Sequence, residues 1–198
     1  KTKWLEGGLH NNPERLRLKL QDLMGEIDGE CERLLLALGY CGGGVTEILT
    51  GNFETILPLA DDCLTFLLGS VKARALASRP PTFFLTEGWL MHENNIVASF
   101  EKSLKDYDRE TALNIQRIIL GGYTRLGFLD TGAYDLNLAF SKALPMAEAL
   151  GLEIEALPVD LDWMNTFLKG PYDDPTLFFR LPPKSRLRFG DWNKMLFR

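Results

Sequence analysis

Cysteine and histidine are scarce in this chain, whose 198 residues include 3 cysteines and 2 histidines. The odd number and irregular spacing of Cys31, Cys41 and Cys63 argue against a framework of structural disulfides. Burial as a small hydrophobic side chain, metal binding and reactivity remain as roles for each cysteine.

Long apolar runs and clusters of positive charge are also missing. No apolar run approaches the roughly 20 residues that span a bilayer, and no basic-then-apolar leader opens the chain. The 22 basic and 27 acidic residues give a net charge of -5, and the basic ones are scattered except in the segment 184–188, KSRLR. We therefore expect a cytoplasmic protein that binds neither membranes nor nucleic acid. The sequence also does not begin with methionine. One expectation is therefore that an upstream strand, which carries a further metal ligand, is missing from it.

What the chain does contain is a regular alternation of short strand patterns and helical patterns. With 45% hydrophobic residues, it can build one sizeable core or two small lobes. The expected strands cover 3–5, 33–38, 54–58, 82–85, 125–129, 152–157 and 177–181. The expected helices cover 13–24, 45–49, 63–68, 96–119 in two pieces, 138–150 and 161–168. This alternation predicts an α/β fold with a parallel, Rossmann-like sheet.

The two halves of the sequence resemble each other. LGYCGGG, ILPLADDCLTFLLGS and PPTFFLT in the first half have counterparts in LGFLDTG, ALPVDLDWMNTFLKGP and DPTLFFRL in the second. An internal duplication would produce two similar lobes facing a cleft. We therefore expect a first α/β lobe over 1–122, a second over 123–183 and a C-terminal tail over 184–198.

Polar and sulfur-bearing side chains follow the expected strands. In parallel α/β folds the loops at the carboxyl ends of the strands emerge at one edge and bind ligands. The residues expected there are His10, Cys41, Asp61, Asp62 and Cys63, and the cleft would also be lined by Tyr40, Gly42, Gly43, Thr86, Trp89 and Asp130. Cys31 precedes its strand, and we expect it at the opposite edge in a structural role.

An imidazole with two thiolates suits zinc, iron, cobalt or nickel better than magnesium or calcium. His10, Cys41 and Cys63 are therefore the candidate metal ligands, with Asp61 and Asp62 as outer partners or alternative ligands. Simpler roles stay open: both aspartates can cap a helix, Cys41 can be buried, and His10 can cap the helix that Pro13 begins.

The motifs LEGGLHNNPERLRLKLQ, LALGYCGGGVTEIL, ILPLADDCLTFLLGS, PPTFFLTEGWL, YTRLGFLDTG and FLKGPYDDPTLFF occur in a characteristic order and spacing. In this respect the chain resembles domain-of-unknown-function family 1638 from Trp4 to Pro183. The family motifs fall here on His10, Cys41, Asp62-Cys63 and Gly88-Trp89. At the position of Asp61, members of the family often have histidine. This difference weakens any metal site or mechanism that needs two histidines.

The resemblance implies an association with corrinoid proteins and their methyltransferases, but it implies no biochemical activity. The first hypothesis is a protein that binds a metal or metallo-cofactor and serves anaerobic one-carbon metabolism. The second is an enzyme with Cys63 or Cys41 as nucleophile, His10 as base and the glycine-loop amides as an oxyanion hole. The third is a module that docks a corrinoid protein, with Trp89 as anchor.

Overall fold

The computed structural model describes residues 1–191, and the internal contacts of the chain divide it into two compact units. The first unit comprises Lys1–Val71 and Asp160–Arg198, and the second comprises Lys72–Val159. This division differs from the expected lobes, because the first unit takes segments from both ends of the chain and residue 122 falls inside the second unit. The expected mixed α/β character is confirmed.

The first unit contains a mixed sheet of strands β1 (Arg33–Leu35), β2 (Glu54–Pro58) and β6 (Phe178–Leu181) in the order β1-β2-β6. β1 runs parallel to β2, whereas β6 runs antiparallel to it. The expectation of parallel strands is therefore wrong for β6. The segment 3–5 forms no strand, and the neighbouring Lys1 and Lys3 form ion pairs with Glu30 and Glu26.

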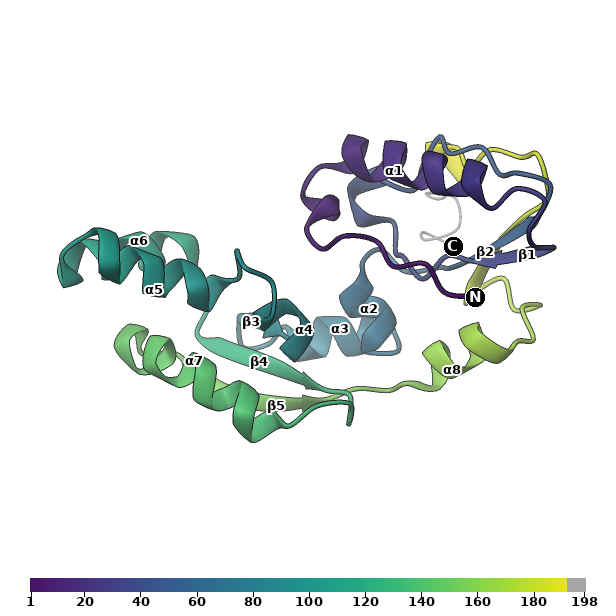
Figure 1. Cartoon of the computed structure of the whole chain (residues 1–198). Helices are drawn as coiled ribbons and strands as arrows, with labels where there is room; N and C mark the ends of the chain where they lie inside the picture. Colours follow the sequence, from purple (N-terminus) through teal and green to yellow (C-terminus); the bar gives the residue numbers. More distant parts are fainter. Residues whose placement is uncertain (192–198) are drawn as a thin grey trace. The chain divides into compact units, whose positions relative to one another are not determined.

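Helices cover both faces of this sheet. On one face lies α1 (Pro13–Glu26), preceded by the short 3-10 helix η1 (Leu9–Asn11); on the other lie α2 (Cys63–Leu67) and α8 (Asp162–Lys169) (Figure 1). Because side chains alternate along a strand, Leu57 packs in the cluster with α1, and its neighbour Ile56 packs with α2 and α8. Trp163 of α8 meets Phe66 of α2 edge to face, with ring centroids 5.2 Å apart. Both faces of β2 are thus buried.

The segment 45–49, expected to be a helix, is not one. Glu47 has a left-handed backbone with φ of 60°, and its N–H donates to the carbonyl of Leu187 at 2.7 Å. Leu49 forms an isolated antiparallel bridge with Arg186. The segment therefore takes its backbone partners from a distant part of the chain, which overrides its local helical preference.

The second unit contains an all-parallel sheet of β3 (Thr82–Leu85), β4 (Arg125–Asp130) and β5 (Glu153–Pro158), in that order. Its helices are α3 (Val71–Ala77), α4 (Glu87–Leu90), α5 (Ile96–Asp106), α6 (Arg109–Ile119) and α7 (Leu136–Leu150) (Figure 1). Leu126 and Phe128 of β4 pack in one cluster with α5 and α7. The expected two-piece helix over 96–119 is confirmed as α5 and α6.

The opposite face of β4 carries a buried charge. Arg125 is only 5% exposed, and its guanidinium donates to the hydroxyl of Thr82 and to the carbonyl of Ala77 and pairs with Glu155. Buried charges persist in proteins when they are paired and hydrogen-bonded in this way. This network joins β3, β4, β5 and the end of α3.

The strand pairing does not confirm the internal duplication. A repeat of the first half in the second would place β3 in one sheet with β1 and β2, but β3 pairs with β4 instead. The Rossmann-like arrangement is likewise not confirmed. Each of the two sheets has only three strands, and the sheet β1-β2-β6 is mixed.

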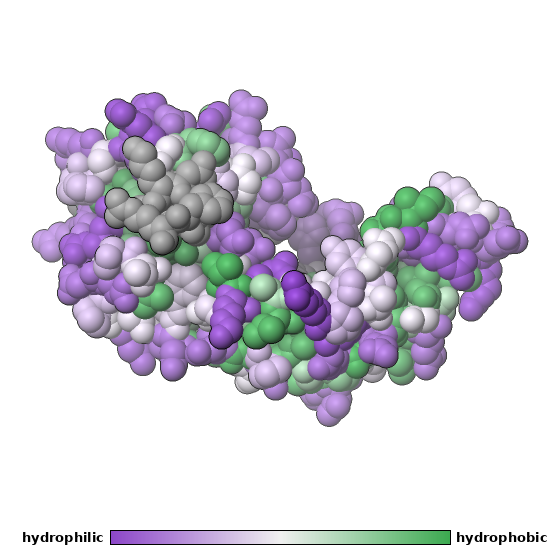
Figure 2. Space-filling view, turned by 180° about the vertical axis from the view of Figure 1, so that it is seen from behind, coloured by the Kyte–Doolittle hydropathy of each residue, from purple (hydrophilic) through white to green (hydrophobic). Residues whose placement is uncertain are grey.

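Hydrophobic side chains also reach the surface. Figure 2 shows hydrophobic areas over the second unit, where Ile118 is 82% and Met91 75% exposed. Within residues 1–191, no helix is both long and apolar enough to cross a membrane.

Candidate functional site

Two loops of the first unit, those that follow β1 and β2, lie side by side. The N–H of Tyr40 donates to the carbonyl of Ala60 at 2.8 Å, and the N–H of Cys41 donates to the carbonyl of Asp61 at 3.0 Å. The loops thus continue the parallel pairing of the two strands beyond their carboxyl ends. The sequence predicted this neighbourhood from strand direction alone.

Gly39 makes this close approach possible. A Cβ atom at this position would lie 2.8 Å from the backbone Cα and C of Asp62 and 2.9 Å from the carbonyl oxygen of Ala60. Such distances are shorter than any ordinary contact, and backbone atoms cannot move aside as a flexible side chain can. A residue without a side chain is therefore needed here.

Two residues after Gly39 begins the 3-10 helix η2 (Cys41–Gly43), which has an unusual backbone conformation. Cys41, Gly42 and Gly43 have φ values of 47°, 65° and 92°. Glycine adopts such values readily, but a cysteine there is uncommon and costs on the order of 1 kcal/mol. Strain of this kind occurs often at functional sites, and it makes Cys41 a candidate.

The surroundings of Cys41 raise the pKa of its thiol to about 11. Partial burial is the main cause, followed by the nearby Cys63 and by the negative charge of Asp62, while a backbone hydrogen bond from Gly39 acts in the opposite direction. The thiol of Cys41 is therefore protonated at neutral pH. The backbone hydrogen bond from Cys41 to Asp61 places this cysteine beside the segment that leads to Cys63.

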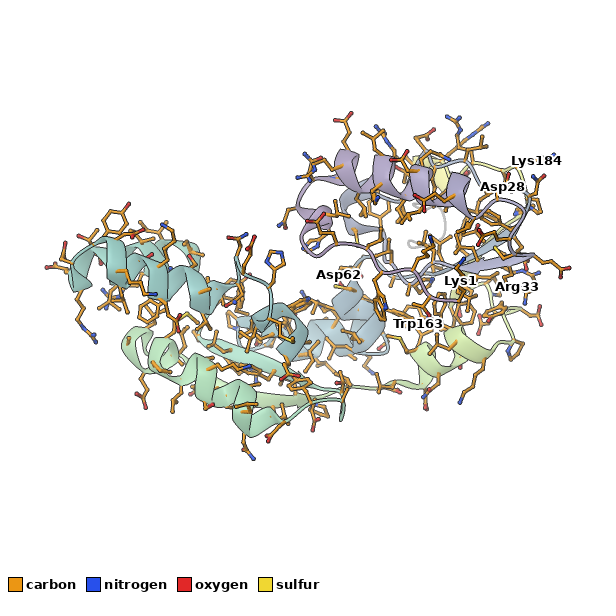
Figure 3. The ribbon with its side chains drawn as sticks, in the orientation of Figure 1. Lys1, Asp28, Arg33, Asp62, Trp163 and Lys184 are labelled. Atoms are coloured by element: carbon orange, nitrogen blue, oxygen red, sulfur yellow. The ribbon has the colours of Figure 1, made fainter. Side chains whose placement is uncertain are left out.

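Asp61, Asp62 and Cys63 lie where β2 leads into α2. Asp62 is the N-cap of α2, where its carboxylate accepts the N–H of Thr65 at 2.7 Å; Figure 3 shows it at the start of the helix. The carboxylate of Asp61 accepts the N–H of Asp62 at 3.1 Å. The capping role that the sequence left open is thus confirmed for Asp62, and the exposed Cys63 occupies the first position of the helix.

His10 lies in η1, exposed to solvent, just before α1. It reaches this position without the preceding strand that the sequence predicted. The first turn of α1 approaches the glycine loop, because a Cβ atom at Gly42 would lie 3.5 Å from Cγ of Pro13. Within the described part of the chain, no three His, Cys, Asp or Glu side chains stand ready to hold a metal ion.

Cys31 lies apart from this neighbourhood in the manner predicted. It precedes β1, at the end of the strand opposite the glycine loop, and packs against the hydrophobic core next to α1.

The other expected cleft residues belong to the second unit. Thr86 caps α4 by accepting the N–H of Trp89 at 3.3 Å, and Asp130 ends β4 and accepts the N–H of Gly132. Tyr134 is a neighbour that the sequence did not predict, and its pKa is raised by burial and by the charges of Asp130 and Glu87. The order of the strands offers no signal for Tyr134, because it lies in a loop and its hydroxyl donates to the carbonyl of Leu129.

A cavity beside the glycine loop includes three of the residues that the sequence predicted to line a cleft. Its volume is about 410 Å³, and its lining combines Tyr40, Gly42 and Gly43 with residues of α1 and with Phe189. Nothing in the local sequence connects Phe189 to this loop, since the contact is made by the fold.

The comparisons with known proteins give a family and no activity. The family model described as "Protein of unknown function (DUF1638)" matches residues 4–168, and the chain therefore belongs to this family. No curated protein and no solved structure matches the chain.

Proposed function

We propose that this family member binds a transition-metal ion or a metallo-cofactor through the thiolates of Cys41 and Cys63. The observation that carries the proposal is the backbone pairing of the two loops, which holds Cys41 beside the segment Asp61–Cys63. Two sulfur donors from separate strand ends favour soft or borderline metals such as zinc, iron, cobalt or nickel. His10 is the proposed third ligand, and Asp61 and Asp62 are the alternatives.

The arrangement of ligands favours a metal that arrives with ligands of its own. A bare zinc ion needs about four donors, whereas the described residues hold no group of three in place. A metallo-cofactor needs fewer protein donors. The family resemblance implies an association with corrinoid proteins, and a corrinoid is such a cofactor because its macrocycle already holds the cobalt. A role in corrinoid-linked methyl transfer is part of the proposal on this ground.

The nucleophile hypothesis receives less support for Cys41. A nucleophilic cysteine works as a thiolate and is usually found with a lowered pKa. The pKa of Cys41 is instead raised, to about 11. Metal binding tolerates a raised pKa, because the metal displaces the thiol proton and the cost appears as a pH-dependent affinity.

The test is a titration with Co²⁺. The protein is first purified without oxygen and stripped of metal. Thiolate ligands give intense near-ultraviolet absorption on cobalt, so the signal reports sulfur coordination directly. We expect Cys41→Ser and Cys63→Ser each to weaken binding by at least about 10-fold, and His10→Ala to weaken it as well. Cys31→Ser is the matched control, because Cys31 lies at the other end of β1, and it should bind cobalt as the wild type does.

Two results would contradict the proposal. If wild-type protein carries no metal by elemental analysis and binds neither Co²⁺ nor a corrinoid, the proposed binding function is wrong. If Cys63 alone then reacts rapidly with iodoacetamide near neutral pH, the nucleophile hypothesis takes its place. If Cys41→Ser binds Co²⁺ as well as the wild type does, the ligand assignment is wrong.

A further inference from the structure

The cavity beside the glycine loop has the size of a small-molecule site. Its volume of about 410 Å³ falls within the roughly 300–1,000 Å³ usual for ligand pockets. It lies wholly within the first unit, and its lining residues are Pro13, Glu14, Arg17, Tyr40, Gly42, Gly43, Thr46 and Phe189. None of the proposed metal ligands is among them, and the cavity is therefore a separate feature.

One charged group in the lining has unused hydrogen-bonding capacity. The guanidinium of Arg17 forms a long ion pair of 3.8 Å with Glu14 and makes no hydrogen bond with any other described residue. The Glu14 side chain is 73% exposed, so that water rather than Arg17 solvates most of its charge. Guanidinium groups present several donors in one plane, a geometry that matches a carboxylate. Arg17 can therefore bind a carboxylate that enters the cavity.

Two aromatic rings form the apolar part of the lining. The rings of Tyr40 and Phe189 have centroids 6.1 Å apart and are tilted by 56°. Phe189 remains 57% exposed, which leaves much of its apolar surface in contact with water. A flat apolar ligand body would remove that surface from water and gain from contact with both rings.

The glycine loop keeps this space open. A Cβ atom at Gly43 would lie 3.4 Å from the hydroxyl of Tyr40, and one at Gly42 would lie against Pro13. Larger side chains at these positions would extend from the loop into the region that Tyr40 and α1 enclose. The hydroxyl of Thr46 donates to the carbonyl of Gly43 at 2.7 Å and fixes the end of the loop.

We propose that this cavity binds a small organic carboxylate with a flat, apolar body. Arg17 pairs with the carboxylate, and Tyr40 and Phe189 contact the body. The site does not depend on the metal function proposed above, because neither cysteine lines it.

The test uses 2-naphthoate, a fluorescent aromatic carboxylate, titrated into the full chain, with the uncharged 2-naphthalenemethanol as the comparison probe. We expect wild-type protein to bind the naphthoate more tightly than the alcohol. Arg17→Met should weaken naphthoate binding by about 10- to 100-fold and leave binding of the alcohol nearly unchanged, since only the charged contact is lost. Phe189→Ala should weaken binding of both probes.

Arg15→Met is the matched control, because Arg15 is an exposed arginine of the same helix that does not line the cavity. It should bind both probes as the wild type does, and circular dichroism should show that every variant folds. Absence of naphthoate binding at millimolar concentration, or equal binding by wild type and Arg17→Met, would overturn the proposal. The double variant Cys41→Ser/Cys63→Ser should retain naphthoate binding while losing cobalt, and loss of both ligands together would show that the cavity is not a separate site.

Discussion

The N–H of Cys41 donates a hydrogen bond of 3.0 Å to the carbonyl oxygen of Asp61. This bond joins the loops that follow two neighbouring parallel strands, and it holds a strained cysteine beside the start of α2. The candidate site therefore depends on backbone pairing more than on side-chain packing.

The first prediction concerns the approach of the two loops. Gly39→Ala should destabilise the protein by about 1–3 kcal/mol, because its new Cβ atom would overlap the backbone of Asp62. Gly25→Ala is the matched control, since Gly25 lies in α1 with no atom within 4 Å of a new Cβ. It should stabilise by about 0.5–1 kcal/mol through its higher helix propensity. Urea unfolding measures both, and equal effects would contradict the proposed close approach.

The second prediction separates the charge of Asp62 from its capping role. Asp62→Asn should lower the pKa of Cys41, because the negative charge of Asp62 is one of the causes that raise it. The variant should keep its stability, since asparagine caps helices as well as aspartate does. Asp62→Ala should lower the pKa as well but should also lose about 0.5–2 kcal/mol with the cap on Thr65.

The measurement for these variants is the alkylation rate of Cys41 as a function of pH, followed by mass spectrometry of its peptide. An unchanged profile in both variants would show that Asp62 does not influence the thiol.

The third prediction concerns stability at alkaline pH. Folding raises the pKa of Cys41 from 9.0 to about 11, which means that the folded state holds this proton more tightly than the unfolded state does. The resulting stabilisation is fully present below pH 9.0 and is lost as the pH rises toward about 11. Relative to Cys41→Ser, the wild type should therefore lose stability across this interval. Denaturant unfolding of both proteins at several pH values tests this, and a constant difference would contradict it.

The fourth prediction concerns the buried charge of the second unit. Arg125→Met should destabilise the protein by about 2–4 kcal/mol, because it leaves the buried hydroxyl of Thr82 and the partly buried carbonyl of Ala77 without their donor. Lys102→Met is the control, since the pair of Lys102 with Asp106 is exposed and its loss should change the stability much less. Thermal unfolding distinguishes the two, and similar losses would show that the Arg125 network contributes little.

Much of the local structure could be predicted because its signals are local. Pro13 and the leucines spaced along 13–24 predicted α1, and the apolar run 82–85 predicted β3 with the bounds that the structure has. The glycines around Cys41 predicted a loop at a strand end, which the positive φ values confirm. Cys31 could be separated from the other cysteines because it precedes its strand.

The partners of the strands could not be predicted in the same way. The runs that form β3 and β6 are similarly apolar and aromatic, yet one joins the parallel sheet and the other lies antiparallel to β2. The duplication hypothesis relied on that local similarity. Likewise, the segment 45–49 has a helical pattern, but its backbone bonds instead to Leu187 and to the side chain of Gln21, both far away in the sequence.

The sequence by itself thus determined most of the strands and helices, the loops that follow β1 and β2, and the placement of Cys41 and Cys63 beyond the carboxyl ends of those strands. The tertiary structure decided which strands share a sheet, the burial that raises the pKa of Cys41, and the cavity that Phe189 and Arg17 line with the glycine loop. The physical reason is that backbone conformation follows from neighbours in sequence, whereas strand pairing, burial and cavities depend on contacts between residues that are far apart in the chain.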